Sequence, residues 1–127
     1  MTGEELDKYL ESVGGLVNGW REDGEPIMSS DYFACCSGWY GIIKDLISGA
    51  IEAGWDRKIL QVKEKFGGLR FYIGAASSEV HDLIRIAEDL SYKTCEICGS
   101  TENVVTEGRW LRTLCDKCRK KKENEVL

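Results

Sequence analysis

Two Cys-x-x-Cys pairs near the C-terminus constrain this chain more than any other feature. The pairs are Cys95/Cys98 and Cys115/Cys118, with sixteen residues between them. This spacing is typical of a structural zinc site, because two thiolates three positions apart can bend around one tetrahedral ion and a second pair completes the coordination. The sequence therefore predicts one bound Zn²⁺ with four cysteine ligands. Since four thiolates leave no position for water, the predicted role of the ion is structural.

The alternative for these cysteines is a pair of disulfides or four uncoordinated thiols. The first residues, Met1–Glu5, are acidic and lack the basic and apolar regions of a signal peptide. We therefore expect a cytoplasmic protein, in which thiols stay reduced. No apolar run approaches the roughly 18 residues needed to span a bilayer, so no membrane association is expected.

The charge is distributed unevenly along the chain. Residues 1–92 carry nine Lys/Arg and sixteen Asp/Glu, whereas residues 93–127 carry eight and six. A length of 127 residues allows one domain of ordinary size, or one core with a small satellite. We predict an acidic core over 1–92 and a zinc-finger module with a basic tail over 93–127. The acidic body argues against nonspecific coating of nucleic acid, while the basic tail leaves open a local contact with phosphates or an acidic partner.

Within the acidic core, apolar spacing predicts three helices. The first covers 4–13, with a Thr2/Glu5 capping box, and ends at Gly14-Gly15. The second covers 39–53, with Ser37 and Gly54 as its caps, and Trp55 is expected to pack just beyond its end. The third follows Ser77 or Ser78 and presents one apolar face. Residues 14–31 are rich in turn formers and predict a loop.

A β-hairpin is predicted between the second and third helices. Apolar and polar residues alternate from Ile59 to Ile73 around Gly67-Gly68. The expected apolar face of the first arm holds Leu60, Val62 and Phe66.

Three further residues of the core invite specific hypotheses. Trp20 lies in the predicted loop, and we expect it to fold back as a lid on the core, because large aromatic side chains are mostly buried; a partner contact is the alternative. Cys35 and Cys36 are adjacent, so their thiols point in different directions and suit neither a chelate nor an unstrained disulfide. We expect them to pack at the start of a helix.

The metal module is predicted to consist of a Cys95–Gly99 knuckle, a hairpin and a short helix. The hairpin joins residues 104–106 to 110–114 through a Glu107-Gly108 turn, and the helix covers 117–125. This order indicates a treble-clef finger, with a zinc ribbon as the alternative. The predicted fold class is thus α+β: a helix–β-hairpin–helix core with a C-terminal zinc finger.

The string Lys-Glu-Lys-Phe-Gly-Gly-Leu-Arg-Phe-Tyr, from Lys63 to Tyr72, resembles a segment of an uncharacterised family of small bacterial, phage and prophage proteins. In that family, as here, the segment is followed by a helix and a C-terminal Cys-x-x-Cys-Gly knuckle. The match runs from about Trp39 to Cys118. The family often has a histidine as the fourth ligand where this chain has Cys118, which keeps the site tetrahedral. The resemblance implies a phage or mobile-element setting and no particular reaction.

Two basic groups of residues are candidates for contact with a partner or with nucleic acid. One lies on the polar face of the first hairpin, and the other surrounds the zinc module, where an aromatic residue among cations can stack on a base. Ordinary solvated surfaces would look the same. The candidates are Lys63, Lys65, Arg70, Tyr72, Arg109, Trp110, Arg112, Lys117, Arg119 and Lys120, with Lys121 and Lys122 next in the tail.

No set of catalytic residues stands out in the sequence. His81 is the only histidine, and beside Asp82 it supports only a remote hydrolase hypothesis. We therefore expect a protein that is not an enzyme and has no small-molecule substrate. The leading hypothesis is an interaction protein that binds and modulates a host protein, as an inhibitor or anti-defence factor would. The alternative is a nucleic-acid-binding regulator that uses the basic zinc finger.

Overall fold

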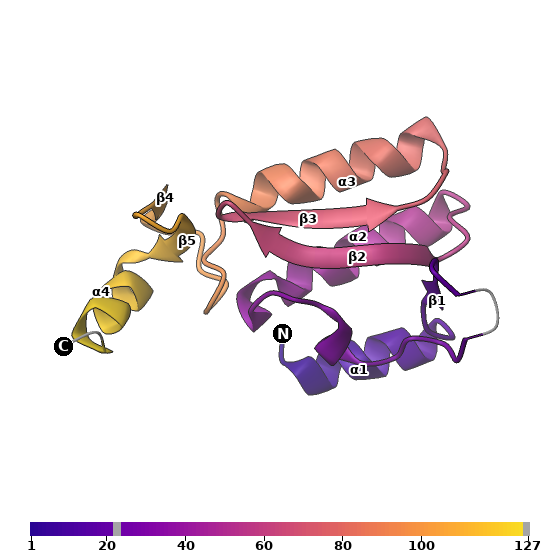
Figure 1. The fold of residues 1–127 in the computed structure, drawn as a ribbon, viewed down its shortest axis with the longest axis horizontal. Coiled ribbons are helices and arrows are strands. Elements are labelled where there is room, and N and C mark those ends of the chain that lie inside the picture. The colour runs from indigo at the N-terminus through magenta and orange to yellow at the C-terminus, as the bar shows by residue number, and fades with distance from the viewer. Residues whose placement is uncertain (22–23, 126–127) are drawn as a thin grey trace.

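The structure is a computed structural model that describes residues 1–21 and 24–125. It confirms the α+β class, with four helices and two small sheets in the described residues (Figure 1). Residues 22–23 of the predicted loop and the side chain of Lys122 lie outside the described part. The helices are α1 (Gly3–Ser12), α2 (Tyr40–Glu52), α3 (Ser78–Ser91) and α4 (Asp116–Glu125), with short 3-10 turns η1 (Ser30–Tyr32) and η2 (Ser37–Trp39). The strands are β1 (Val17–Asn18), β2 (Lys58–Lys65), β3 (Gly68–Ile73), β4 (Val104–Glu107) and β5 (Arg112–Cys115).

Of the three N-caps predicted from the sequence, those of α1 and α3 are confirmed. Thr2 and Glu5 form the predicted capping box at α1, and the Ser77 hydroxyl accepts the Val80 N–H at the start of α3. At α2 the predicted N-cap is wrong, because Ser37 lies in η2 and the helix begins after Trp39 without a side-chain cap. The 3-10 turn takes the place of a capped start. Gly54 follows the end of this helix with a φ of 91°, as expected of a glycine that ends a helix.

The larger sheet has the strand order β1-β2-β3, with β1 parallel and β3 antiparallel to β2. The sequence did not predict β1, because a two-residue strand is too short to show a period-two pattern. It pairs Val17 with Lys58 and Asn18 with Ile59, and so fastens the segment after α1 to the sheet.

An irregularity in β2 changes which residues face the core. The register shifts between Ile59 and Gln61, so that Ile59 and Val62 are both buried while Leu60 is only half-buried. The predicted apolar face of Leu60, Val62 and Phe66 is therefore wrong at two of its three positions. An extra residue in one strand of a pair reverses the side of the residues that follow it.

The turn of this hairpin consists of Phe66 and Gly67, one residue earlier than predicted. Lys65 pairs with Gly68, and the two turn residues have φ values of 54° and 84°. Positive φ at both central positions is the requirement of a type I′ turn, which fits the twist of the flanking strands. Gly68 is the first residue of β3 and not a turn residue.

The main core lies between the larger sheet and the three helices α1, α2 and α3 (Figure 1). Trp39 is fully buried in this core, and Trp55 packs on Phe71 with ring centroids 5.9 Å apart, as expected for a residue just beyond α2. α3 also covers the outer edge of β3, because Ser91 Oγ accepts the Leu69 N–H at 2.9 Å and Glu88 Oε2 accepts the Phe71 N–H at 3.1 Å. This edge is thus closed to further strand pairing.

The predicted burial of Trp20 is wrong. Its side chain is 74% exposed, and its indole N–H donates to the Leu60 carbonyl at 2.9 Å. Cys35, by contrast, packs half-buried against the core just before η2, whereas Cys36 is exposed. The packing prediction therefore holds for the first thiol only.

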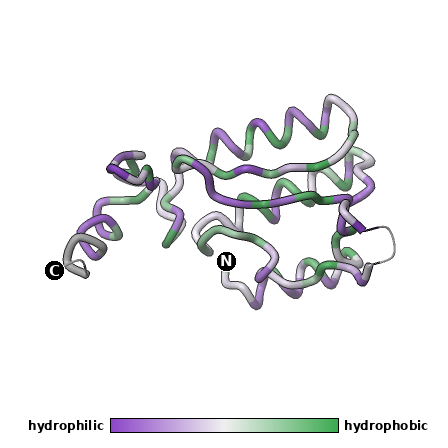
Figure 2. The backbone as a smooth tube through the Cα atoms, in the orientation of Figure 1, coloured by the Kyte–Doolittle hydropathy of each residue, from purple (hydrophilic) through white to green (hydrophobic). Residues whose placement is uncertain are grey.

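Beyond α3 the chain becomes more polar. In Figure 2, the coloured first part of α4 is mostly hydrophilic, without the alternation seen along α1 and α3. Within the described residues, no helix has the length and apolar character needed to cross a bilayer.

Candidate metal centre

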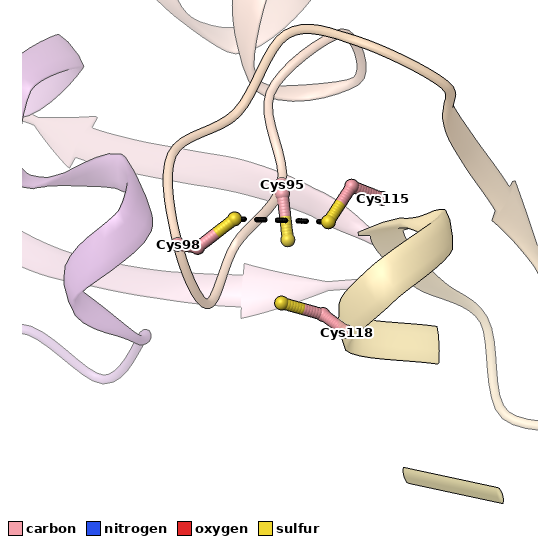
Figure 3. A group of neighbouring side chains, drawn as sticks. All are labelled: Cys95, Cys98, Cys115 and Cys118. Atoms are coloured by element: carbon pink, nitrogen blue, oxygen red, sulfur yellow. Dashed lines mark hydrogen bonds between the residues drawn. The ribbon is translucent and has the colours of Figure 1, made fainter. Parts of the chain in front are cut away.

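The first cysteine pair lies in a tight knuckle after α3. The Cys95 N–H donates to the Ser100 carbonyl at 2.8 Å, and the Gly99 N–H donates to the Cys95 carbonyl at 2.9 Å. Gly99 closes the turn with a φ of 81°, a conformation that glycine adopts without steric cost. The knuckle turns the side chains of Cys95 and Cys98 toward the same point (Figure 3).

The second pair is brought back by the hairpin of β4 and β5. Cys115 is the last residue of β5, and Cys118 lies in the first turn of α4. Knuckle, hairpin and helix therefore follow in the order predicted for a treble clef. The hairpin loop is longer than predicted: Glu107 pairs with Arg112, so residues 108–111, including Trp110, form the loop.

The four sulfur atoms converge on one place. The ligand atoms of Cys95, Cys98, Cys115 and Cys118 lie within 4.8 Å of one another, with 3.7 Å between the Sγ atoms of Cys98 and Cys115 (Figure 3). Tetrahedral zinc with Zn–S bonds of about 2.3 Å requires sulfur atoms about 3.8 Å apart. The cluster therefore forms a single site that fits one structural zinc ion, as the spacing predicted.

The surroundings of the cluster lower the pKa of one thiol, that of Cys95. Burial opposes the charged form of Cys95, but the backbone N–H groups of Cys98, Cys115 and Ile97 outweigh it and lower the pKa of Cys95 to about 7. Burial and the neighbouring thiols raise the pKa of Cys118 above its usual value. Four thiolates so close together need a cation to ionise fully, because like charges suppress one another's ionisation. A divalent ion would supply that charge.

The knuckle is attached to the core through Glu96, a residue that sequence reasoning missed. The Glu96 side chain is only 4% exposed. One carboxylate oxygen accepts the Cys36 N–H at 3.0 Å, and the other contacts the Arg112 guanidinium at 3.2 Å. Its carbonyl accepts the Gly38 N–H at 2.7 Å. A buried carboxylate between two cysteine ligand positions has no signature in the chain itself, because its partners are distant in sequence.

A second attachment joins the two hairpins. The Thr113 hydroxyl donates to the Gly67 carbonyl at 2.6 Å and lies 2.6 Å from the Thr106 hydroxyl. The β2–β3 turn consequently rests against the β4–β5 hairpin. The boundary predicted between residues 92 and 93 stays a prediction, and these contacts cross it.

Where the two hairpins meet, their loops enclose a groove of about 460 Å³, named here the junction groove. The core hairpin provides one wall and the zinc-module loop the other. Its lining residues are Glu64, Lys65, Phe66, Arg109, Trp110 and Leu111. Phe66 is 67% exposed and Trp110 81% exposed. The groove thus has an apolar surface that the fold itself does not cover.

The predicted contact residues fall into separate groups in the structure. Lys65, Arg109 and Trp110 meet at the junction groove. Lys117 and Lys120 line a different hollow, of about 420 Å³, beside Cys98 and Cys115.

The remaining candidates are engaged within the molecule. Arg112 pairs with Glu96, and Arg119 pairs with Asp116 and with Glu107, the latter at 3.2 Å. Lys63 lies over the Tyr72 ring, and Arg70 donates to the Tyr92 hydroxyl at 2.9 Å. Arg112 and Arg119 therefore hold the module together, and the first hairpin's cations are braced by aromatic rings.

His81 is exposed on α3, and its neighbour Asp82 pairs with Arg85 at 2.6 Å. The carboxylate that the hydrolase hypothesis would use is therefore occupied by a guanidinium. The hypothesis gains no support from this arrangement.

Comparison with protein-family models, with curated proteins and with solved structures finds no match to this chain.

Proposed function

We propose that this chain is a non-catalytic, zinc-stabilised interaction protein that binds a partner protein through the junction groove. The observation that carries the proposal is the exposure of Phe66 and Trp110 around one groove. Exposed apolar patches bordered by polar residues commonly mark interaction sites. The resemblance to phage and prophage proteins supports a host protein as the partner, which the protein would bind and modulate.

The backbone at Phe66 supports a binding role for its side chain. Phe66 adopts a φ of 54°, a left-handed conformation that is unfavourable for a bulky residue. Such strain concentrates at functional sites, at about 1–3 kcal/mol for each residue. An asparagine would satisfy the same turn without this strain, so stability alone does not account for an exposed phenylalanine here.

Zinc has a defined part in this proposal. Arg109, Trp110 and Leu111 belong to the loop whose following strand ends at Cys115. A module of about 35 residues has too little apolar surface to fold alone, and its shape depends on the metal. Zinc would therefore hold one wall of the groove in place against the other.

Site-specific photo-cross-linking tests this proposal. A photoreactive residue at position 110 is expected to give one discrete protein adduct in cells of the natural host, and chelation of zinc is expected to abolish it. The matched control is position 20, because Trp20 is also an exposed tryptophan, 74% exposed, but lies near β1 and away from the groove. No adduct at position 110, or the same adduct at both positions, contradicts the proposal.

A second candidate function is nucleic-acid binding, which the exposed cations of α4 favour. Lys117, Lys120 and Lys121 are exposed on one short helix. If roughly five phosphates were neutralised, the logarithm of the affinity would fall with the logarithm of the salt concentration at a slope near −4.5. A flat salt response, or no binding at about 50 mM salt, rules this candidate out.

A further inference from the structure

We propose that the junction groove receives an acidic segment of the partner that is anchored by a large apolar side chain. This inference rests on the proposed function and specifies the chemistry of the partner. It follows from the lining of the groove, from the charges at its rim and from the arrangement of the other cations.

The junction groove has an apolar lining and is large enough to hold one large side chain of a partner. Phe66, Trp110 and Leu111 line it, and all three are substantially exposed. Its volume of about 460 Å³ falls in the range of roughly 300–1,000 Å³ in which pockets hold small ligands. A leucine, phenylalanine or tryptophan side chain with its adjoining backbone fits such a space. Among these side chains, a large aromatic ring such as that of tryptophan provides much of the binding energy at many protein interfaces.

The rim of the groove is positively charged. Lys65 and Arg109 are both exposed there, and the Lys65 ammonium lies 5.5 Å from the centre of the Phe66 ring. The only acidic lining residue, Glu64, is half-buried, and its carboxylate accepts the Gly67 N–H at 2.7 Å. The two cations therefore face outward beside an apolar surface. Complementary charge in the partner means Asp or Glu next to the apolar anchor.

The same charges fit a polynucleotide less well. A phosphate backbone needs a track of cations, but Arg112 and Arg119 pair with carboxylates of this chain. Lys117 and Lys120 line the hollow beside the cysteines and do not line the junction groove. The acidic residues of 1–92 also repel a polyanion. An acidic peptide requires only the two cations that are present.

Fluorescence anisotropy with the zinc-loaded full-length chain tests the inference. The probe is a labelled hexapeptide, Asp-Glu-Leu-Trp-Glu-Asp, compared with one in which lysine replaces every acidic residue and one in which alanine replaces Leu and Trp. We expect binding of the first peptide only. An oligothymidylate of about twelve nucleotides is the competing probe, and tighter binding of this probe overturns the inference.

Matched variants locate the binding. Trp110→Ala is expected to weaken peptide binding by about tenfold or more, whereas Trp20→Ala leaves it unchanged. The double variant Lys65→Glu/Arg109→Glu is expected to lose binding, and Lys117→Glu/Lys120→Glu, which changes the net charge equally, is expected to retain it. Each variant is first checked for one zinc ion per chain and an unchanged melting temperature. Equal effects in the two double variants contradict the inference.

The results also separate this inference from the proposed function. If the cross-link at position 110 forms but no acidic peptide binds, the chemistry assigned to the partner is wrong and the binding role survives. If neither is observed, both are wrong.

Discussion

The pKa of the Cys35 thiol is set by its surroundings in the folded protein. Burial, together with the nearby carboxylate of Glu96, raises the pKa of Cys35 to about 12. Because the thiolate is the reactive form, we expect native Cys35 to resist iodoacetamide at pH 8 and to become reactive as the pH rises toward 12.

A raised pKa in the folded state also means that this thiol favours the folded protein below the ordinary cysteine pKa and loses that contribution as the pH rises through about 12. Mass spectrometry of the Cys35 peptide measures the reaction, with protein unfolded in denaturant as the control. Equal labelling of native and unfolded protein at pH 8 would contradict the burial.

Gly38 is a position where a single methyl group has a predictable effect. A Cβ there would lie 2.2 Å from the Cys95 carbonyl oxygen and 2.4 Å from that of Glu96, and both are backbone atoms of the knuckle. Gly38→Ala is therefore expected to lower the free energy of unfolding by about 1–3 kcal/mol.

The matched control for this change is Gly41→Ala in α2, where a Cβ meets nothing within 4 Å. We expect it to be neutral or to stabilise the protein by up to about 1 kcal/mol. Urea denaturation of the two variants measures the difference. Equal urea midpoints for the two variants would show that Gly38 does not lie against the backbone of the knuckle.

The β2–β3 turn gives a test of whether stability and binding oppose each other in one element. Phe66→Asn replaces a strained residue with one that tolerates a φ of 54°, and it is expected to raise the free energy of unfolding by about 1 kcal/mol. Phe66→Ala removes the ring without this relief and is the control.

Both Phe66 variants are expected to weaken partner binding, because both lack the ring. Thermal unfolding measures the first effect and peptide anisotropy the second. A Phe66→Asn variant that is less stable than the natural protein would show that the ring contributes to folding.

The elements of this fold could be predicted where the pattern is local. The capping box of Thr2 and the hydrogen bond accepted by the Ser77 hydroxyl each lie within one helical turn. The sequence alone therefore located these two helix starts. The register shift after Ile59 could not be predicted, because it depends on how β2 pairs with both β1 and β3. The same limit explains the misplaced turn: the preference of Gly67-Gly68 for a turn is local, but the pairing of Lys65 with Gly68 is not.

The metal site and the junction groove also differ in how far the sequence could predict them. Four cysteines at a characteristic spacing specify their own convergence, so the candidate zinc ligands were fully predicted. For the groove, Lys65, Arg109 and Trp110 were recognised by type, whereas Phe66 was assigned to the core face because its alternation continued that of Val62. Glu96 was missed since its partners, Cys36 and Arg112, come from distant segments.

For the molecule as a whole, we expect removal of the metal to affect residues 93–127 more than residues 1–92. Metal binding supplies on the order of 10–16 kcal/mol in modules of this kind. After chelation we expect amide protons of β4, β5 and the start of α4 to lose protection from hydrogen exchange, while those of β2 and β3 keep it. Hydrogen exchange with zinc added back is the control.

The contrary outcome of the chelation experiment is equally clear. Loss of protection throughout β2 and β3 would show that residues 1–92 do not fold apart from the module. Unchanged protection everywhere would show that the four cysteines hold no metal of structural importance.

The junction groove has walls that come from distant parts of the chain, with Phe66 on one side and Trp110 on the other. During translation the first wall leaves the ribosome well before the second, and we expect the second to take shape only after Cys118, the last predicted zinc ligand, has followed. A nascent or prematurely terminated chain would therefore carry only one wall of the groove, and under the function proposed above it would not bind a partner. We therefore expect the supply of zinc in the producing cell to limit when the second wall forms, even after translation is complete.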